Sequence, residues 1–216
     1  MLRLYLVRHG QSVNNAEPNF ENHQFDPALV DMGIQQSAAI ANHLKNGSDN
    51  GALNYGYDIH QIYTSPQLRA LQTTAPIAAA LELRPEIWVK IHERGGVIVL
   101  HRRGILHERG MTRSQIATQF PTFKIPYQIT ENGWWNGSGS LESNDDVVVR
   151  ARVVANDLMI QARTARDAGV LLVSHGTFLN FLMQTLLKDF DNKYLHFNAA
   201  LSRIDIDRST KATLRY

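Results

Sequence analysis

The sequence predicts an α/β fold, a three-layer α/β domain built on a mainly parallel sheet. Short apolar runs typical of buried strands alternate with longer segments in which apolar residues recur at helical spacing, and this alternation is typical of layered α/β domains. The 216 residues suffice for one substantial core, and no repeat of solenoid length divides them. We therefore expect a single domain over residues 1–216.

The first strand and the first helix are marked by composition and by a stop signal. Residues 2–7 form a β-prone run that ends before Gly10, which predicts a buried strand feeding a loop. The next apolar residues recur at helical spacing, and Gly47 follows them as a stop signal. They are Ile34, Ala38, Ala41 and Leu44.

A second strand and a second helix are expected just beyond residue 60. Residues 61–64 indicate a strand, and the following Ser65-Pro66 predicts that a helix opens there, with Pro66 at its first position. Pro76 is expected to kink this helix or to mark its end. The apolar face consists of Leu68, Leu71, Ala75 and Ala78.

From about residue 91 to residue 140 the regular pattern loosens. Glycine pairs, Pro121, Pro126 and a run of Gly, Trp, Asn and Ser replace clear periodicity. One short helix is expected within this stretch, over residues 113–120. We interpret the segment as an irregular insertion or cap over a site.

The C-terminal third returns to alternating helices and strands. Ser143, Asp145 and Asp146 predict a capped helix start. The apolar residues that continue this helix at the expected spacing are Val147, Ala151, Val154 and Leu158. The remaining expected elements are strands at 170–173, 201–206 and near 213–216, and a helix at 178–187.

Bulk composition excludes several classes of function. The formal net charge is only +2 and Lys and Arg are dispersed, so we expect no nucleic-acid partner. The absence of cysteine excludes disulfides, a cysteine nucleophile and thiolate metal sites. The N-terminal apolar run is broken by Arg3 and is too short for a signal sequence or a membrane span. We expect a cytoplasmic protein without a membrane partner, and nothing in the sequence identifies an oligomeric state.

Two short polar motifs stand at the ends of the two most apolar strands, Arg8-His9-Gly10 and Ser174-His175-Gly176. Functional groups of parallel sheets gather at the carboxyl ends of the strands. In the first motif the guanidinium offers planar donors to a phosphoryl group, a neutral imidazole can attack phosphorus, and glycine lets backbone approach closely. The alternative for this tripeptide alone is a structural histidine beside a surface arginine.

The run from Thr64 to Thr73, TSPQLRALQT, places Arg69 near the start of a helix that follows a strand. A helix start supplies amide donors and positive potential, and the arginine adds a second guanidinium. Taken alone, Arg69 would be read as an exposed helical arginine. Together with the first motif, the run favours an anion-binding site.

These three motifs, in this order, resemble the signature of the histidine phosphatase superfamily, which includes the phosphoglycerate mutases and related phosphatases. The first block is the run from Leu6 to Asn15, LVRHGQSVNN, and the second is the Ser-Pro-x-x-Arg-Ala-x-Gln-Thr stretch ending at Thr73. The resemblance covers roughly the whole chain. It implies a phosphoglycerate mutase-like three-layer α/β/α sandwich with a mixed, mostly parallel sheet.

The resemblance also implies a role for each matching residue. His9 would be the nucleophile, with its other ring nitrogen held by a backbone carbonyl. The phosphate-binding set would be Arg8, Asn15, Arg69, His175 and Gly176. Gly176 would also keep space beside His175 and offer its backbone amide. Because phosphoryl transfer needs mainly positioning and fixed positive donors, the arginines would replace a metal, and we expect no metal and no cofactor.

The leaving alkoxide needs a proton, and the resemblance implies a glutamate in the segment after the second motif. The sequence His-Glu-Arg-Gly occurs twice, with Glu93 in the first copy and Glu108 in the second. We favour Glu93, because it follows a short apolar run and lies at about the family's distance from Arg69. Glu93 would first act as the acid and then as the base toward water, and Glu108 would be a surface or salt-bridged carboxylate.

The predicted function is a phosphatase that hydrolyses a small phosphorylated metabolite through a phosphohistidine on His9. The basic and tryptophan-rich blocks of the phosphoglycerate mutases are absent after Asn15 and around Glu93, which favours hydrolysis. Within the enzymes, the alternatives are a phosphoglycerate mutase or a sugar bisphosphatase. From another class, the alternative is a catalytically inactive protein that binds a phosphorylated ligand.

Several residues after Glu93 are candidates for substrate specificity. They are Arg94, Arg102, Arg103, Trp134 and Trp135. The arginines would bind a second anionic group of the substrate, with a solvated basic loop as the equal alternative. The two tryptophans would form an aromatic wall or lid, or they would pack the cap onto the body of the domain.

Overall fold

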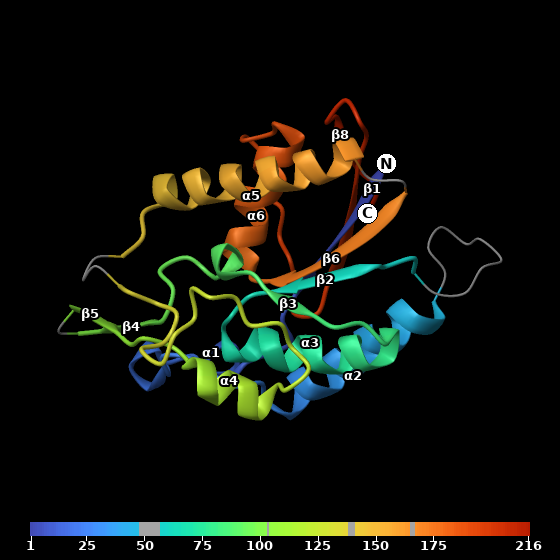
Figure 1. Ribbon diagram of the computed structural model, residues 1–216. Coiled ribbons are helices and arrows are strands. Elements are labelled where there is room, and N and C mark those ends of the chain that lie inside the picture. The colour runs from blue at the N-terminus through green and yellow to red at the C-terminus, as the bar shows by residue number, and fades with distance from the viewer. Residues whose placement is uncertain (48–56, 103, 138–140, 165–166) are drawn as a thin grey trace.

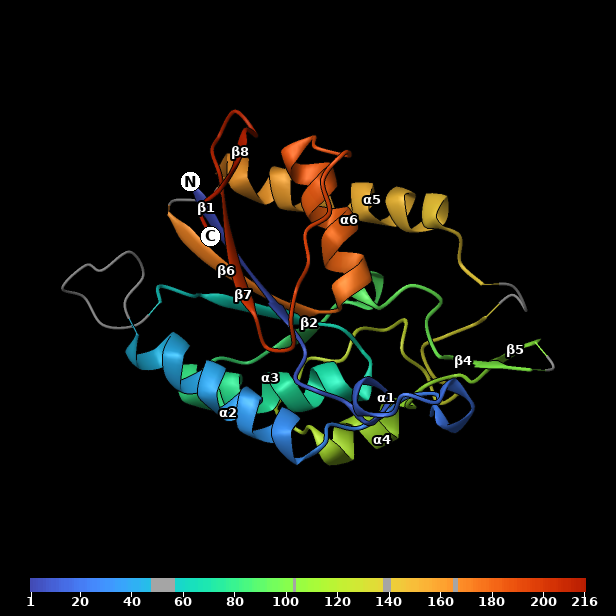
Figure 2. The ribbon, with the colours of Figure 1, turned by 180° about the vertical axis from the view of Figure 1, so that it is seen from behind.

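The computed structural model describes residues 1–47, 57–102, 104–137, 141–164 and 167–216. Figure 1 shows a central sheet with helices on both of its faces, and Figure 2 shows the same layers from behind. The helices on one face are α5 (Asn144–Thr164) and α6 (Gly176–Leu187), and those on the other are α2 (Asp31–Asn46) and α3 (Leu68–Leu81). The predicted three-layer α/β/α architecture is therefore confirmed.

Within the described residues the central sheet has six strands in the order β3-β2-β6-β1-β7-β8. They are β1 (Leu2–Arg8), β2 (Gln61–Thr64), β3 (Glu86–Ile87), β6 (Ala168–Ser174), β7 (Leu201–Ile206) and β8 (Ala212–Leu214). β6 runs parallel to both β1 and β2, and β2 runs parallel to β3, whereas β7 is antiparallel to β1 and β8. The sheet is thus mixed and mostly parallel, and the carboxyl ends of β1, β2 and β6 meet at one edge.

The central strand β1 is apolar on both faces because helices cover both faces. Leu4 and Leu6 belong to the core between the sheet and α5 and α6. Tyr5 and Val7, which point the opposite way, belong to the core that includes residues of α2 and α3. This arrangement explains why the first strand is an almost continuous apolar run.

Helix α2 ends at Asn46 with Gly47 as its C-cap, as expected. Its buried residues are Gly33, Ser37, Ile40, Ala41 and Leu44. The prediction of its inner face is therefore wrong at Ile34, which is 57% exposed, and at Ala38. The reason is steric, because a Cβ at Gly33 would lie 2.1 Å from the carbonyl oxygen of Gln11, so the small residues of α2 face the first loop.

Helix α3 begins at Leu68, with Gln67 as its N-cap, so the expected helix start at Pro66 is wrong by two positions. Pro76 lies inside α3, which continues to Leu81, and therefore does not mark its end. The residue after Pro76, Ile77, is fully buried in the core that α3 shares with α2. Packing of this face holds the helix together across the hydrogen bond that a proline cannot donate.

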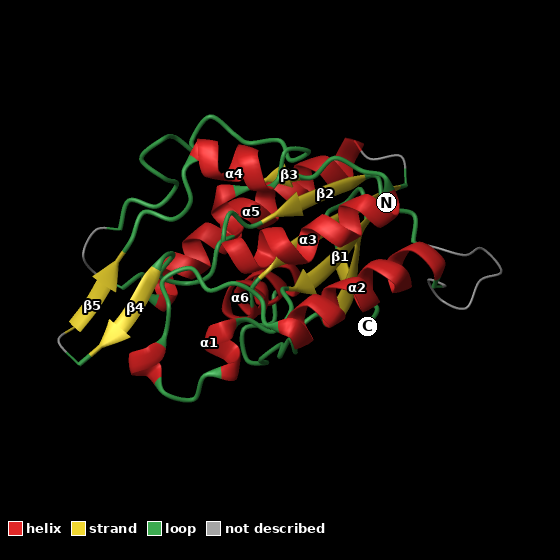
Figure 3. Ribbon diagram, turned by 90° about the horizontal axis from the view of Figure 1, so that it is seen from below, coloured by secondary structure: helices red, strands yellow, loops and turns green. Residues whose placement is uncertain are grey.

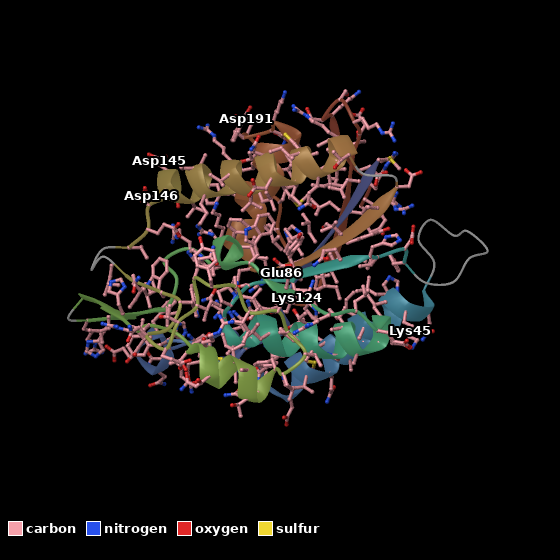
Figure 4. All side chains as sticks on the ribbon, in the orientation of Figure 1. Lys45, Glu86, Lys124, Asp145, Asp146 and Asp191 are labelled. Carbon is pink, nitrogen blue, oxygen red and sulfur yellow. The ribbon has the colours of Figure 1, made fainter. Side chains whose placement is uncertain are left out.

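The irregular segment after β3 contains a short hairpin and one helix. The hairpin consists of β4 (Ile98–His101) and β5 (Gly104–His107), and Figure 3 shows it projecting beyond the sheet. Helix α4 (Arg113–Gln119) confirms the short helix expected there, whereas the hairpin was not predicted. A third core joins this segment to α3 and β3. Glu86 and Lys124 lie side by side where the segment bridges to the sheet edge (Figure 4).

The C-terminal elements follow the predictions closely. Ser143 Oγ accepts a hydrogen bond from the backbone amide of Asp146, whose carboxylate accepts one from the amide of Ser143, and this reciprocal cap starts α5. Figure 4 shows Asp145 and Asp146 at the first turn of this helix. The last strand, β8, begins and ends slightly before the expected residues 213–216. Among the described residues, no helix is both long and apolar enough to span a lipid bilayer.

Candidate active site

The two His-Gly motifs lie side by side at the carboxyl edge of the sheet. Arg8 is the last residue of β1 and is in register with Ser174, the last residue of β6. The backbone amide of His9 donates to the carbonyl of Ser174 over 2.9 Å. His175 is the N-cap of α6, and its ring centroid lies 5.0 Å from that of His9. Pairing of two central strands therefore brings the imidazoles together.

His9 is held as a neutral imidazole. Its side chain is almost fully enclosed, with 2% exposure, and Nδ1 donates to the carbonyl of Gly10 over 2.7 Å. Nε2 then carries the lone pair and accepts from Nε of Arg69 over 3.1 Å. Burial, and next the charge of Arg69, lower the pKa of His9 well below its ordinary value. The carbonyl expected to orient this ring is thus that of Gly10.

Arg69 enters the site from the first turn of α3 and is nearly buried. One of its terminal nitrogens lies 3.9 Å from Oδ1 of Asp26, and the same oxygen accepts from the amide of Leu68 over 2.9 Å. Burial raises the pKa of Asp26 to about 6, although Arg69 and the Leu68 amide oppose this change. The sequence interpretation had assigned no role to Asp26, because its partners lie more than forty positions away in the chain.

The loop after His9 is fixed from two sides. The backbone amide of Gly10 donates to the hydroxyl of Thr73 over 3.0 Å, and that hydroxyl donates to the carbonyl of Arg69. A Cβ at Gly10 would lie 2.5 Å from the carbonyl oxygen of Gly33. The backbone that approaches Gly10 closely is therefore that of α2. The hydrogen bond between Thr73 and Gly10 explains why the second motif extends beyond Arg69.

His175 is fully buried between His9 and β2. Its Nε2 is 2.7 Å from the hydroxyl of Ser65, and its Nδ1 has no hydrogen-bond partner among the described residues. Burial, followed by the charge of Arg69, lowers the pKa of His175 well below its ordinary value. A second neutral imidazole therefore stands beside the first.

Arg8 is anchored by the loop that leads into β7. One terminal nitrogen donates to the carbonyl of His196 over 2.7 Å, and Nε has no partner among the described residues. Burial lowers the pKa of Arg8, whereas nearby Glu93 raises it. A Cβ at Gly176 would lie 3.5 Å from Arg8, an ordinary contact distance. The expectation that Gly176 is needed to keep space beside His175 is therefore wrong, since a small side chain fits there.

Glu93 faces the start of α6. Its carboxylate accepts hydrogen bonds from the backbone amides of Thr177 and Phe178, at 3.2 and 3.1 Å, and from that of Arg94. Its own amide donates to the side chain of Gln67, which is buried and also bonds the carbonyl of Gly96. A carboxylate at a helix N-terminus is held by the helix dipole as well as by these bonds.

Gln67 was missed by the sequence interpretation, although it lies within the second motif. The rival acid, Glu108, is exposed at the end of the hairpin and lines neither of the cavities described below.

Asn15 and Asn198 connect the first motif to the last loop. Nδ2 of Asn198 donates to the carbonyl of His9 and to Oδ1 of Asn15, both over 3.1 Å. Oδ1 of Asn15 also accepts from the amide of Ser12, so its Nδ2 remains available as a donor. Asn198 was not predicted, because no local motif marks it.

A cavity of about 210 Å³ lies over His9. Its lining includes the predicted residues Arg8, His9, Asn15, Arg69, Glu93 and Arg94. His175 lies behind this lining and does not reach it. Three guanidinium groups, an amide donor and an imidazole lone pair thus converge on a space suited to one tetrahedral anion, and a carboxylate stands at its side.

The structure separates the candidate specificity residues. Arg94 lines the cavity and donates to Asn144. Arg102 is 83% exposed, forms an ion pair with Glu21 and lines neither cavity. Arg103 lies outside the described residues. The solvated alternative therefore holds for Arg102.

Trp134 and Trp135 pack the irregular segment and line neither cavity. Trp134 is only 6% exposed, and the ring of Trp135 would meet a Cβ at Gly96 within 2.3 Å. Both rings also contact His92. Of the two interpretations left open by the sequence, these contacts favour packing of the segment onto the body of the domain.

The chain is similar to known proteins along nearly its whole length. A family model described as the histidine phosphatase superfamily (branch 1) matches residues 4–216. The chain is 28% identical over 215 residues to a protein of Photorhabdus laumondii named "Probable phosphoglycerate mutase GpmB", covering 97% of this chain and 87% of the relative. It is 23% identical to the broad-specificity phosphatase YOR283W of Saccharomyces cerevisiae, covering 98% of this chain and 82% of the relative.

The fold also matches solved structures. A mycobacterial glucosyl-3-phosphoglycerate phosphatase in complex with VO3 superimposes with a TM-score of 0.63 at 23% identity. The match covers 99% of this chain and 97% of that one. At this identity the likeness concerns the fold alone.

Proposed function

Because the chain belongs to the histidine phosphatase superfamily, we propose that it is a phosphatase that hydrolyses a small phosphorylated metabolite through a phosphohistidine on His9. The observation that carries this proposal is the state of the His9 ring. Nδ1 is occupied by the carbonyl of Gly10, burial keeps the ring neutral, and His9 borders a cavity that is also lined by three arginines. A neutral, oriented imidazole beside fixed cations is what attack on a phosphomonoester requires.

In the first step, Nε2 of His9 forms a bond to phosphorus while the bond from phosphorus to the alcohol oxygen breaks. Arg8, Arg69 and Nδ2 of Asn15 hold the equatorial oxygens, and His175 supports the ring of His9 from behind. The hydrogen bond from Arg69 to Nε2 is exchanged for one to a phosphoryl oxygen as substrate binds. Glu93, in its protonated form, gives its proton to the leaving oxygen.

In the second step, Glu93 is a carboxylate and takes a proton from water. The oxygen of that water forms a bond to phosphorus, the bond from phosphorus to Nε2 breaks, and inorganic phosphate leaves. The same carboxyl group serves both steps because its position at the start of α6 is fixed by backbone amides. The cations take the part that a metal plays in other phosphoryl transfers, so the proposed reaction uses no metal or cofactor.

The segment over residues 91–140 is proposed to cap this site. Its first residues supply Glu93 and Arg94 to the cavity. The third hydrophobic core of the domain packs the segment against α3. The lack of cysteine suits a reducing compartment, so we place the reaction in the cytoplasm.

The test replaces His9 by alanine. We expect turnover of p-nitrophenyl phosphate to fall by at least about a thousandfold, because removal of an attacking group loses the covalent route, while the far-ultraviolet circular dichroism stays unchanged. His60→Ala, at a histidine far more exposed and bonded to Asp58, is the matched control and should retain activity. A folded His9→Ala protein with full activity would exclude His9 as the nucleophile.

Rapid quenching with radiolabelled substrate tests the intermediate directly. Label that stays on the protein in base and is lost in acid indicates phosphohistidine. A wild-type protein that binds inorganic phosphate but neither turns over substrate nor takes up label would instead be the inactive binding protein.

A second candidate is a phosphoglycerate mutase, favoured by the 28% identical relative of that name. Phosphorus NMR of a reaction with 3-phosphoglycerate separates the two, because a mutase yields an isomer and a phosphatase yields free phosphate. A sugar bisphosphatase would be recognised by preferential release of one phosphate from fructose bisphosphates.

A further inference from the structure

A second, larger cavity adjoins the one over His9. Its volume is about 400 Å³, within the range of small-molecule sites. The two cavities have only Arg8 and Glu93 in common. The larger one extends along α6 and under the loop that leads from α6 to β7, away from His9.

The position of Glu93 relates this cavity to the reaction. In an in-line displacement the leaving oxygen departs on the side of phosphorus opposite to the nucleophile. That oxygen must come within hydrogen-bond reach of the acid that protonates it. Glu93 lines both cavities. The carbon skeleton attached to the leaving oxygen therefore lies on the side of the larger cavity.

The walls of the larger cavity are suited to an apolar group. Phe181, Tyr194 and Leu195 contribute ring and alkyl surface, and Leu195 is 80% exposed at the rim. Two amide side chains of the lining are engaged in hydrogen bonds, whereas Nε of Arg8 and Nε2 of His196 have no partner among the described residues. Oδ1 of Asn180 accepts from the amide of Tyr194, and Oδ1 of Asn144 accepts from Arg94.

The charged side chains that line the larger cavity are of both signs. They are Arg8, Lys193 and Glu93. Asp191 lies on the same loop as Lys193, and Asp145 and Asp146 lie at the start of α5 (Figure 4), but none of these three carboxylates lines the cavity. Charge alone therefore does not decide which alcohol this cavity takes, and its ring and alkyl surface is the feature that does.

We propose that this larger cavity is the subsite for the alcohol part of the substrate, and that it favours phosphomonoesters whose alcohol presents a ring-sized apolar surface. The proposal rests on the proposed phosphatase function. It places the leaving group along α6 instead of under the hairpin, where Phe25 and Ile98 line the smaller cavity.

The experiment compares benzyl phosphate with ethyl phosphate, whose alcohols are similarly weak acids, so that their ratio of kcat/KM isolates recognition of the ring. Phe181→Ala and Leu195→Ser should each lower this ratio, by about fivefold to tenfold for Phe181→Ala, because about 50 Å² of apolar contact is lost. Leu106→Ser, at a half-exposed leucine of the hairpin that lines neither cavity, is the matched control. Circular dichroism checks the fold of Phe181→Ala, and Leu195→Ser alters a residue too exposed to affect folding.

Ile98→Ser tests the rival position of the ring. A ratio that falls in Ile98→Ser and stays constant in Phe181→Ala and Leu195→Ser would overturn the proposal. Calorimetric titration of both esters into His9→Ala, with and without Leu195→Ser, separates this proposal from the phosphatase function. If the wild-type protein releases no phosphate, the function fails, while tighter binding of benzyl phosphate that depends on Leu195 still supports the subsite. Equal binding of the two esters would refute it.

Discussion

The buried carboxyl of Asp26 controls the charge balance around Arg69. It is the nearest carboxylate to that guanidinium, at 3.9 Å, and it also caps the first amide of α3. Its Oδ2 has no partner among the described residues. Burial raises the pKa of Asp26 more than the attraction of Arg69 lowers it, and the pKa reaches about 6. A carboxyl whose pKa is raised in the folded state stabilises the fold below its unfolded pKa, and this stabilisation is lost as the pH rises through the folded pKa.

Asp26→Asn is expected to remove this pH dependence. Because the pKa of Asp26 rises from 3.8 in the unfolded chain to about 6 in the fold, the contribution of this carboxyl group to the wild-type unfolding free energy should fall by about 2 kcal/mol between pH 4.5 and pH 7.5. The free energy of unfolding of Asp26→Asn, measured relative to wild type by urea titration, should therefore increase by that amount over the same range. A difference that is constant or falls with pH would contradict the raised pKa.

Short sequence motifs predicted the residues proposed to act in the reaction. The residues that position them depend on contacts between distant parts of the chain, which no local motif marks. Arg8, His9 and Arg69 could be predicted because each belongs to a short pattern at a strand end or helix start. Asp26 and Asn198 could not, since their partners Arg69 and His9 are distant in the sequence. The sequence left two interpretations open for the tryptophans, because a glycine-rich stretch with two tryptophans is compatible with a lid and with a packed cluster alike.

Helix α5 fixes the segment that bears Glu93. Arg150, on α5, donates to both carboxylate oxygens of Glu142 and to the carbonyls of Lys90 and His92. Glu142 in turn accepts from the amide of Gly95. One guanidinium thus ties the residues on both sides of Glu93 to a helix that is itself packed on the sheet.

Arg150→Met is expected to lower both stability and activity. Removal of one partner leaves the half-buried Glu142 and two carbonyls without their donor, which should cost roughly 3 kcal/mol in unfolding free energy. The freed segment should lower kcat more than it raises KM, because Glu93 acts on the leaving oxygen. Arg152→Ala, an exposed arginine of the same helix, should alter neither quantity. Unchanged kcat in Arg150→Met would show that Glu93 is positioned without α5.

At the scale of elements, periodicity predicted where most helices and strands lie, and it predicted the inward side of α5 but not that of α2. The start of α3 was placed two residues early because Ser65-Pro66 was taken as its opening, whereas Ser65 instead bonds His175. The hairpin β4–β5 was missed because Leu100 and Leu106 are exposed on it, so its strands lack the usual alternation of buried and polar residues.

At the scale of the whole molecule, four buried histidines among the described residues have a lowered pKa. Burial is the first cause for His9, His92, His175 and His196, and nearby arginines lower the pKa further; that of His92 falls to about 4. A histidine whose pKa is depressed in the fold contributes stability above its unfolded pKa of 6.5, and this stability is lost as the pH falls.

The protein is therefore expected to lose stability in mild acid. Between pH 7.5 and pH 5.5 His92 alone should cost about 1 kcal/mol, and the other buried histidines act in the same direction. Asp26 should return somewhat less than about 1 kcal/mol over this range, so a net loss of stability is expected. Urea unfolding at the two pH values measures it. Equal or greater stability at pH 5.5 would show that these imidazoles accept protons in the fold.

The register between β1 and β6 has a consequence for how the protein is made. Leu2 pairs with Ala168 and Arg8 with Ser174, so the imidazoles meet only when nearly opposite ends of the polypeptide come together. A chain still emerging from the ribosome contains His9, the proposed nucleophile, from the outset. It has no anion site until β6 has been synthesised and has paired with β1. Contacts between residues so far apart in the sequence form slowly. The rate at which turnover recovers after dilution from denaturant would therefore measure how fast β1 and β6 pair.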